Sequence, residues 1–398
     1  MTERRLIFVN RVYQPSGEAT AQLLTDLAEG LAARGWPVHV LTAGSGATAQ
    51  HGVTIHRTGT PGQHSGMVSR ALAYRRFLGA VRRQLATLVR PGDIVVALTD
   101  PPMLGTDVAE ALAGRGVHVV QWIQDIYPEI AAIHFGPLAG FLLGGLRRRR
   151  DRAWAGSSVC ITLGRDMAEA VTAMGVPAAR VHVQPNWAPR ELDEPAPAGA
   201  VAEIRRRWNA DDRFVVAYSG NLGRVHEFAT VLGAAARLQA DTRIAFRFVG
   251  HGPQWKKVAA AVHDRSLANV TLQPPVPRAE LGAMLAAADA HLVTLQPAYG
   301  RLVYPSKLAG VLAAGRPALF VGPPDGDIAR LLHAQDCGAA FAPGADGVLA
   351  DTLLRWSRDP AAVLRLGASA RRAYTTGFTV TAALAGWDTL LRDLPGPM

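Results

Sequence analysis

One lysine stands where its chemistry is useful, at the start of a short apolar run near the end of the chain. Lys307 is one of only 3 lysines beside 39 arginines, and it follows Ser306 in the stretch VYPSKLAGVLAAGRP. The first turn of a helix leaves backbone N–H groups unpaired and carries a positive dipole, so this position suits a phosphate group. A purely structural reading stays open, in which Ser306 caps a helix and Lys307 is solvated.

Three glycine-containing loops follow predicted strands in the same half of the chain. They run over residues 219–223, 250–252 and 322–326. Glycine lets backbone N–H groups approach an anion closely. Together with Arg224 and Lys307, these loops favour a diphosphate ligand.

In the first half, the run QDIYPE places Asp125 and Glu129 just past the end of a predicted strand. Ligands of open α/β sheets bind outside the carboxyl ends of the strands. Both carboxylates are therefore candidates for polar contacts with a ligand. The alternative is that Asp125 caps a helix that starts near Pro128.

The elements that position these residues alternate between short apolar runs and amphipathic segments of helical period, which predicts parallel α/β sheets. Predicted strands fall at 6–10, 38–41, 93–98, 117–122, 158–161, 214–218, 244–249, 270–272, 290–295 and 318–321. The acidic, proline-containing segment at 191–200 reads as a linker. We therefore expect one domain over 1–190 and a second over 201–377, with a helix at 378–398 packing back on the first.

Composition bounds the class of protein. The chain has 398 residues, 49% hydrophobic and 19% charged, which indicates a folded protein with two cores. No apolar run reaches the length of a membrane span and no signal peptide is expected. Cys160 and Cys337 lack metal-ligand spacing and fit buried thiols of a cytoplasmic protein. The loop after the first predicted strand, residues 11–17, lacks G-x-G-x-x-G, so no dinucleotide cofactor is expected there.

Charge points to an anionic partner, since the formal net charge is +10. No basic motif with interleaved aromatic residues is present, so we expect no nucleic acid partner. An apolar stretch runs directly into the five arginines of Arg147–Arg152. Such a segment predicts peripheral contact with an anionic membrane on its inner face, whereas the plainer alternative is a solvated helix face.

Five motifs in order carry a resemblance to a known family. They are residues 10–26 (NRVYQPSGEATAQLLTD), 124–129 (QDIYPE), 219–228 (SGNLGRVHEF), 248–253 (FVGHGP) and 305–317 (PSKLAGVLAAGRP). The chain resembles the retaining glycosyltransferases of family 4, in the bacterial subgroup of colanic acid and O-antigen transferases, over nearly its whole length. The resemblance implies the GT-B fold, with two Rossmann-like parallel-sheet domains facing across a cleft.

That resemblance implies a metal-independent enzyme that moves a sugar from a nucleoside diphosphate, with UDP favoured, to an acceptor hydroxyl. The second domain would bind the donor and the first would bind the acceptor. The implied donor-binding residues are Gly17, Gly220, Asn221, Arg224, His226, Gly250, Tyr304, Ser306 and Lys307. Asp125 would be the catalytic residue, and no metal or other cofactor is implied. The acceptor would be a lipid-linked sugar or a natural product.

The chain also departs from the family pattern. Leu302 and Gly310 stand where many members carry two glutamates, and Gln124 replaces a common histidine. Asn221 and His226 occupy the places of the usual arginine and lysine. The departures predict a cationic donor site that works without a carboxylate. Two alternatives remain, namely a sugar-nucleotide epimerase of the same fold and a catalytically silent nucleotide-binding partner.

Overall fold

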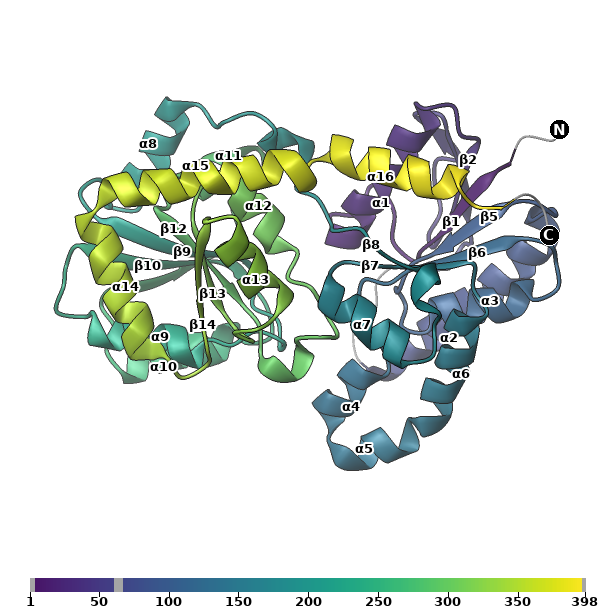
Figure 1. Ribbon diagram of the computed structural model, residues 1–398, viewed down its shortest axis with the longest axis horizontal. Coiled ribbons are helices and arrows are strands. Elements are labelled where there is room, and N and C mark those ends of the chain that lie inside the picture. Colours follow the sequence, from purple (N-terminus) through teal and green to yellow (C-terminus); the bar gives the residue numbers. More distant parts are fainter. Residues whose placement is uncertain (1–3, 61–66, 396–398) are drawn as a thin grey trace. The chain divides into compact units, whose positions relative to one another are not determined.

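The computed structural model describes residues 4–60 and 67–395 and is drawn in Figure 1. The chain divides into two compact units. Unit 1 comprises Met1–Pro185, Arg301–Tyr304 and Val380–Met398, and unit 2 comprises Asn186–Gly300 and Pro305–Thr379. The backbone therefore leaves unit 1 after Pro185, before the acidic segment at which the sequence placed the boundary.

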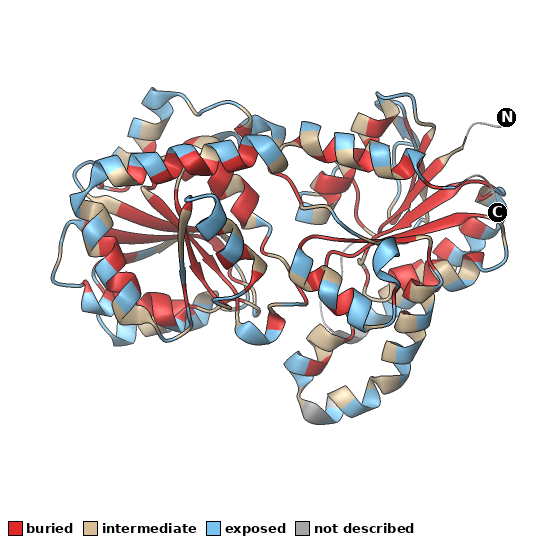
Figure 2. Ribbon diagram, in the orientation of Figure 1, coloured by how far each residue is buried: buried red, intermediate tan, exposed pale blue. Residues whose placement is uncertain are grey.

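Unit 1 is built on an eight-stranded sheet in the order β3-β4-β2-β1-β5-β6-β7-β8. Every neighbouring pair is parallel except β3 with β4. The strands are β1 (Leu6–Val9), β2 (Val38–Thr42), β3 (Ala49–Gln50), β4 (Val53–Arg57), β5 (Ile94–Ala97), β6 (His118–Trp122), β7 (Val159–Thr162) and β8 (Val181–Val183). Central strands such as β1 and β5 are buried along their whole length, because helices cover both faces of a parallel sheet (Figure 2).

Helices accompany the sheet of unit 1. They are α1 (Ala19–Ala32), α2 (Met67–Leu88), α3 (Leu104–Leu112), α4 (Glu129–Phe135), α5 (Pro137–Leu142), α6 (Gly144–Ala155), α7 (Arg165–Ala173) and α16 (Val380–Arg392). The last helix returns to this unit, where Trp387 meets the ring of Trp122 edge-on at 4.9 Å. Its Asp388 accepts a 2.7 Å hydrogen bond from the Trp36 indole.

Unit 2 carries a six-stranded, fully parallel sheet in the order β11-β10-β9-β12-β13-β14. Its strands are β9 (Phe214–Asn221), β10 (Ile244–His251), β11 (Val270–Gln273), β12 (Ala290–Thr294), β13 (Ala318–Val321) and β14 (Gly338–Phe341). Its helices are α8 (Ala198–Arg207), α9 (Ala229–Arg237), α10 (Trp255–Asp264), α11 (Leu281–Ala287), α12 (Lys307–Ala313), α13 (Asp327–Ala334), α14 (Asp346–Arg358) and α15 (Pro360–Gly377).

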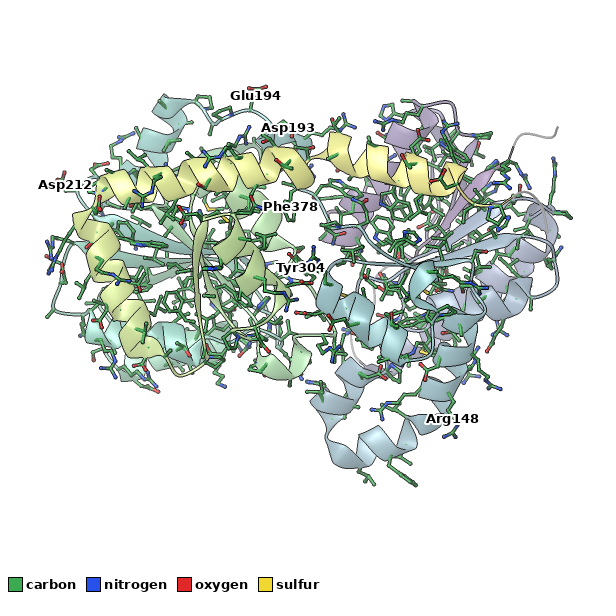
Figure 3. All side chains as sticks on the ribbon, in the orientation of Figure 1. Arg148, Asp193, Glu194, Asp212, Tyr304 and Phe378 are labelled. Atoms are coloured by element: carbon green, nitrogen blue, oxygen red, sulfur yellow. The ribbon has the colours of Figure 1, made fainter. Side chains whose placement is uncertain are left out.

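The acidic segment at 191–200 is packed against unit 2. Tyr374 donates its hydroxyl proton to the Asp193 carboxylate, and Arg371 donates to the carbonyl of Leu192 at 2.8 Å. Figure 3 labels Asp193 beside α15. The prediction of a linker between domains was therefore wrong at this segment, because two side chains of α15 hold it.

Helix length and hydropathy bear on membrane contact. Within residues 4–60 and 67–395, no helix is both long and apolar enough to span a bilayer.

Cys160 and Cys337 are buried free thiols, as predicted.

Candidate functional site

The centre of unit 2 is the point where its strand order reverses. From β9 the chain builds outward through β10 to β11, and then returns to place β12 on the other side of β9. The carboxyl ends of β9 and β12 thus define the crevice in which doubly wound sheets bind ligands. Lys307 begins α12, the helix that follows β12.

Lys307 points toward an imidazole at this reversal. Its Nζ lies 3.0 Å from Nε2 of His226 and 4.6 Å from the centroid of the Tyr218 ring. The other imidazole nitrogen, Nδ1, donates a 2.7 Å hydrogen bond to the carbonyl of Thr294 at the end of β12. This contact fixes the tautomer, so Nε2 presents a lone pair to Lys307. The alternative of a solvated Lys307 was therefore wrong.

Burial sets the charge state of this pair. It lowers the pKa of Lys307 from the usual 10.5 to about 7. Burial, and secondarily the charge of Lys307, lower the pKa of His226 to about 3. The imidazole is hence neutral at neutral pH and acts as a hydrogen-bond acceptor. The pKa of Lys307 is close to neutral pH, so a bound anion would stabilise its charged form.

Glycines let the ends of β9 and β10, next to Lys307, approach each other. Gly220 and Gly250 pair across β9 and β10, and a Cβ on Gly250 would lie 1.9 Å from the carbonyl oxygen of Gly220. A Cβ on Gly252 would lie 2.3 Å from Oδ1 of Asn221. Any larger residue at these places would push the loops apart, which explains the glycines that the sequence singled out.

Two glutamines hold the 223–226 loop from either side. Nε2 of Gln254 donates to the carbonyls of Gly223 and His226, at 2.6 and 3.0 Å. Nε2 of Gln296 donates to the carbonyls of Arg224 and His226, at 2.9 and 3.1 Å. Sequence reasoning missed both, because nothing in the pattern distinguishes a glutamine that binds backbone from one in water.

A pocket of about 180 Å³ opens beside Lys307, entirely within unit 2. Its polar lining is Ser219, Ser306 and Lys307, and the remaining walls are apolar. Gly310 lines it as well, and a Cβ there would meet only the side chains of Leu285 and Leu192, at 3.6 and 3.8 Å. The lining contains one cation and no carboxylate, the composition expected from the family departures.

The other predicted donor residues of unit 2 lie around this loop. Ser306 is exposed and occupies the N-cap position of α12, but its side chain makes no capping hydrogen bond. Asn221 and Arg224 are exposed. Unit 2 thus brings together Gly220, Asn221, Arg224, His226, Gly250, Ser306 and Lys307.

Gly17 and Tyr304, also predicted to contact the donor, belong to unit 1. Gly17 precedes α1, and its carbonyl accepts a 3.0 Å hydrogen bond from Gln22. Tyr304 ends a short segment that joins unit 1 through backbone pairing, since Val303 bridges Asp125 and the Ile126 amide donates to Leu302 at 2.9 Å.

Polar residues also gather at the carboxyl ends of the unit 1 strands. Arg11, after β1, makes two hydrogen bonds to the Asp100 carboxylate after β5, at 2.9 and 2.8 Å. Glu18 lies 3.5 Å from the same guanidinium. This pair occupies the strand-order reversal of unit 1, where β1 adjoins both β2 and β5. The sequence did not single out either member.

Asp125 follows β6 at the same edge of that sheet. Burial, and secondarily the charge of Asp100, raise its pKa to about 6. The cap of α4 is Pro128 and receives no side-chain hydrogen bond, so Asp125 does not cap this helix. Among the residues that the structure describes, no donor pairs with the Asp125 carboxylate, which leaves it available to a ligand.

The described ranges contain no cluster of side chains that could bind a metal ion. No group of three or more His, Cys, Asp or Glu side chains there could hold a metal ion. Asp325 precedes α13, and Asp327 begins that helix and pairs with Arg330 at 2.8 Å. The run Asp-Gly-Asp is thus a turn that leads into a helix.

Proteins of similar sequence are named as glycosyltransferases. Residues 19–187 match the glycosyl transferase 4-like domain. The chain is 28% identical over 281 residues to the probable glycosyltransferase WbjE of Pseudomonas aeruginosa, with 68% of each chain covered. It is 30% identical over 211 residues to the putative colanic acid biosynthesis glycosyl transferase WcaI of Escherichia coli (strain K12), covering 52% of this chain and 51% of that one.

Solved structures show the same architecture. Anabaena Alr3699/HepE, crystallised in complex with UDP, superimposes with a TM-score of 0.74 at 16% identity, covering 98% of this chain and 100% of that one. The same protein in complex with UDP-glucose gives a TM-score of 0.72. The chain is therefore similar to the family 4 glycosyltransferases of the colanic acid and O-antigen type, and its fold is the GT-B fold. It is a glycosyltransferase, and the comparisons support transfer over the epimerase and silent-partner alternatives.

Proposed function

We propose that this glycosyltransferase takes a sugar from a nucleoside diphosphate, with UDP as the nucleotide, and transfers it to an acceptor hydroxyl with retention at the anomeric carbon. One observation carries the proposal. Lys307 lines a pocket at the strand-order reversal of unit 2, and its ammonium contacts the neutral imidazole of His226. The UDP and UDP-glucose complexes of HepE support the choice of nucleotide.

The chemistry requires charge stabilisation more than covalent help. The bond between the anomeric carbon and the diphosphate oxygen breaks, and the leaving diphosphate gains negative charge. The acceptor oxygen forms the new bond on the same face and gives its proton to the leaving phosphate oxygen. Lys307 supplies a fixed cation for the diphosphate from a poorly solvated position, where electrostatic stabilisation is strongest.

Asp125 has the second role in the proposal. Its carboxylate belongs to unit 1, follows strand β6 and has a pKa of about 6, so it is mostly ionised at neutral pH. We assign it to the acceptor side, where its negative charge stabilises the positive charge that develops on the sugar. Because the lysine carries the diphosphate charge, the proposal includes no metal ion or other cofactor.

The acceptor in this proposal is a lipid-linked sugar at the inner face of the cell membrane. The similar protein WcaI is named for colanic acid biosynthesis. The surface of unit 1 described in the next subsection supports this choice over a water-soluble natural product.

Calorimetric titration with UDP tests the donor site. Lys307→Ala is expected to weaken UDP binding by at least about tenfold, the size of one lost charge-assisted contact. Lys256→Ala is the matched control, because Lys256 is an exposed lysine of the same unit, on α10. Equal UDP affinity in the wild type and Lys307→Ala would remove the central observation from the proposal. A parallel titration with EDTA present is expected to give the same affinity.

A further inference from the structure

Exposed apolar side chains gather on one projection of unit 1. Within residues 4–60 and 67–395, six of the ten large apolar side chains that are exposed lie between residues 133 and 146. We call these six the apolar surface: Ile133, Phe135, Leu138, Phe141, Leu142 and Leu146. The most exposed are Phe141 at 84%, Leu138 at 74% and Leu142 at 72%. A contiguous exposed apolar set is unusual on a protein surface and marks a contact site.

Three consecutive helices present this surface. Helices α4, α5 and α6 form a projection from unit 1, with α5 at its outer end (Figure 1). Gly136 turns the chain between α4 and α5 with φ of 88°. Of α4, only Ala132 is buried, so this helix and α5 contribute almost nothing to the core (Figure 2). The chain therefore maintains short helices whose apolar side chains face outward.

The charges around the apolar surface are positive. No Asp or Glu occurs between Glu129 and Asp151. Glu129 itself is neutralised by Arg150, whose guanidinium donates to both carboxylate oxygens at 2.7 and 2.9 Å. The projection therefore carries no free carboxylate to repel an anionic surface.

The arginine cluster divides into two groups with different uses. Arg149 pairs with Asp107 and Glu110 of α3, and Arg150 is buried against Trp154 at 4.6 Å. Arg148 is exposed and forms no ion pair within the described ranges; Figure 3 labels it on the outer side of α6. Arg152, one helical turn further on, is exposed too. Arg147 lies 3.5 Å from the Glu129 carboxylate, so three of the five arginines pair within unit 1, whereas Arg148 and Arg152 are exposed.

From this arrangement we propose that the apolar surface inserts into the interfacial region of an anionic lipid bilayer, with Arg148 and Arg152 contacting the headgroups. Short helices with phenylalanine and leucine on one side and cations beside them lie in the headgroup region of such membranes. The lipid-linked acceptor of the proposed function gives this contact a purpose. The contact itself is tested without any substrate, so each proposal can fail independently.

Flotation of the full chain with vesicles tests the contact. Wild-type protein is expected to float with vesicles of mixed phosphatidylcholine and phosphatidylglycerol, and to bind pure phosphatidylcholine less. The double variant Leu138→Ser/Phe141→Ser is expected to lose at least about tenfold in the vesicle-bound to free ratio. Its matched control is Val348→Ser/Leu364→Ser, which removes two exposed apolar side chains from unit 2, at 60% and 67% exposure.

The charge component has its own pair of variants. Arg148→Glu is expected to reduce binding to the anionic vesicles, and the reduction should shrink in high salt because screening already weakens the wild-type charge contact. Arg265→Glu, at an exposed arginine of unit 2, controls for the change in net charge. UDP affinity by calorimetry should be unchanged in all four variants, and circular dichroism melting curves that match the wild type would show that both units are folded.

Three results would overturn the proposal. The wild type could remain unbound on anionic vesicles, or the Leu138→Ser/Phe141→Ser protein could float as well as its control. The wild type could also prove to be a dimer by light scattering that this double variant converts to monomer without any effect on flotation. The last result would make the apolar surface a contact between two copies of this chain.

Discussion

The Nζ atom of Lys307 lies 3.0 Å from Nε2 of His226, and both side chains are held by burial in forms that complement each other. The histidine is neutral and offers a lone pair, because its Nδ1–H is committed to the Thr294 carbonyl. The lysine, with a pKa of about 7, gives up its proton readily until an anion arrives. Binding of a diphosphate and protonation of Lys307 are therefore linked.

This linkage predicts how UDP affinity depends on pH. In the free protein Lys307 is charged below pH about 7 and neutral above it. A bound diphosphate favours the charged form and raises that pKa, so UDP affinity is full below pH 7 and falls as pH rises. The fall approaches tenfold per pH unit, the limit for uptake of one proton.

Calorimetry in buffers of different ionisation enthalpy checks the prediction, since proton uptake changes the observed heat. In Lys307→Met the uptake should disappear. An affinity that stays constant between pH about 6.5 and 8.5, with no proton uptake by the wild type, would contradict the assignment of the cation.

Asp125 predicts a second pH effect, on turnover and not on donor binding. Its pKa of about 6 means that the carboxylate is lost as pH falls through 6. The rate should therefore drop on the acid side, while Lys307 produces the alkaline drop, and kcat/KM should be bell-shaped. Asp125→Asn is expected to lower kcat by about tenfold to a thousandfold and to abolish the acid limb.

UDP affinity is the control for that variant. Asp125 belongs to unit 1 and the Lys307 pocket belongs to unit 2, so Asp125→Asn should bind UDP as tightly as the wild type. A full acid limb in the Asp125→Asn enzyme would show that another group titrates there.

Alternating patterns were enough to predict both α/β sheets and to find Lys307, since strand and helix periods are local properties of the chain. Composition alone misled at residues 191–200. Proline and acidic residues look like a linker until Tyr374 and Arg371, far along the chain, bind Asp193 and Leu192. The same limit applies to the arginine run, because the partners of Arg149 lie on another helix.

The site residues that the sequence did not reveal all depend on contacts between segments that are distant along the chain. Gln254 and Gln296 act through backbone carbonyls, so their role depends on where two loops meet in space. Arg11 and Asp100 come together only because β1 and β5 are neighbours in the sheet. Neither contact produces a residue spacing that can be recognised within one segment of the sequence.

The close approach of β9 and β10 at Gly220 and Gly250 predicts different effects on stability for alanine substitutions at two glycines, Gly250 and Gly17, that the sequence placed in the donor site. Gly250→Ala would bring a Cβ to 1.9 Å from the Gly220 carbonyl oxygen, so the loops must separate. We expect a loss of about 2 kcal/mol or more in unfolding free energy, and weaker UDP binding.

Gly17→Ala is the matched control, because a Cβ there meets nothing within 4 Å. Its unfolding free energy should stay within about 0.5 kcal/mol of the wild type. Urea unfolding followed by circular dichroism measures both variants. If Gly250→Ala proved as stable as Gly17→Ala, the close packing of the two loops would be refuted.

Replacing Gln254 is expected to disorder the 223–226 loop without changing the charge of the site. Gln254→Leu keeps the approximate side-chain volume but removes both hydrogen bonds to the carbonyls of Gly223 and His226. The loop then has to be ordered by the ligand, so UDP should bind about three- to thirtyfold more weakly. Amide hydrogen exchange should rise at residues 223–226 in the free variant and return toward the wild-type level when UDP is bound. The pH at which UDP affinity begins to fall should remain that of the wild type, because Gln254 has no charge and the Lys307–His226 contact is retained. A weaker affinity with unchanged exchange in this loop would instead assign the loss to a direct contact between Gln254 and the nucleotide.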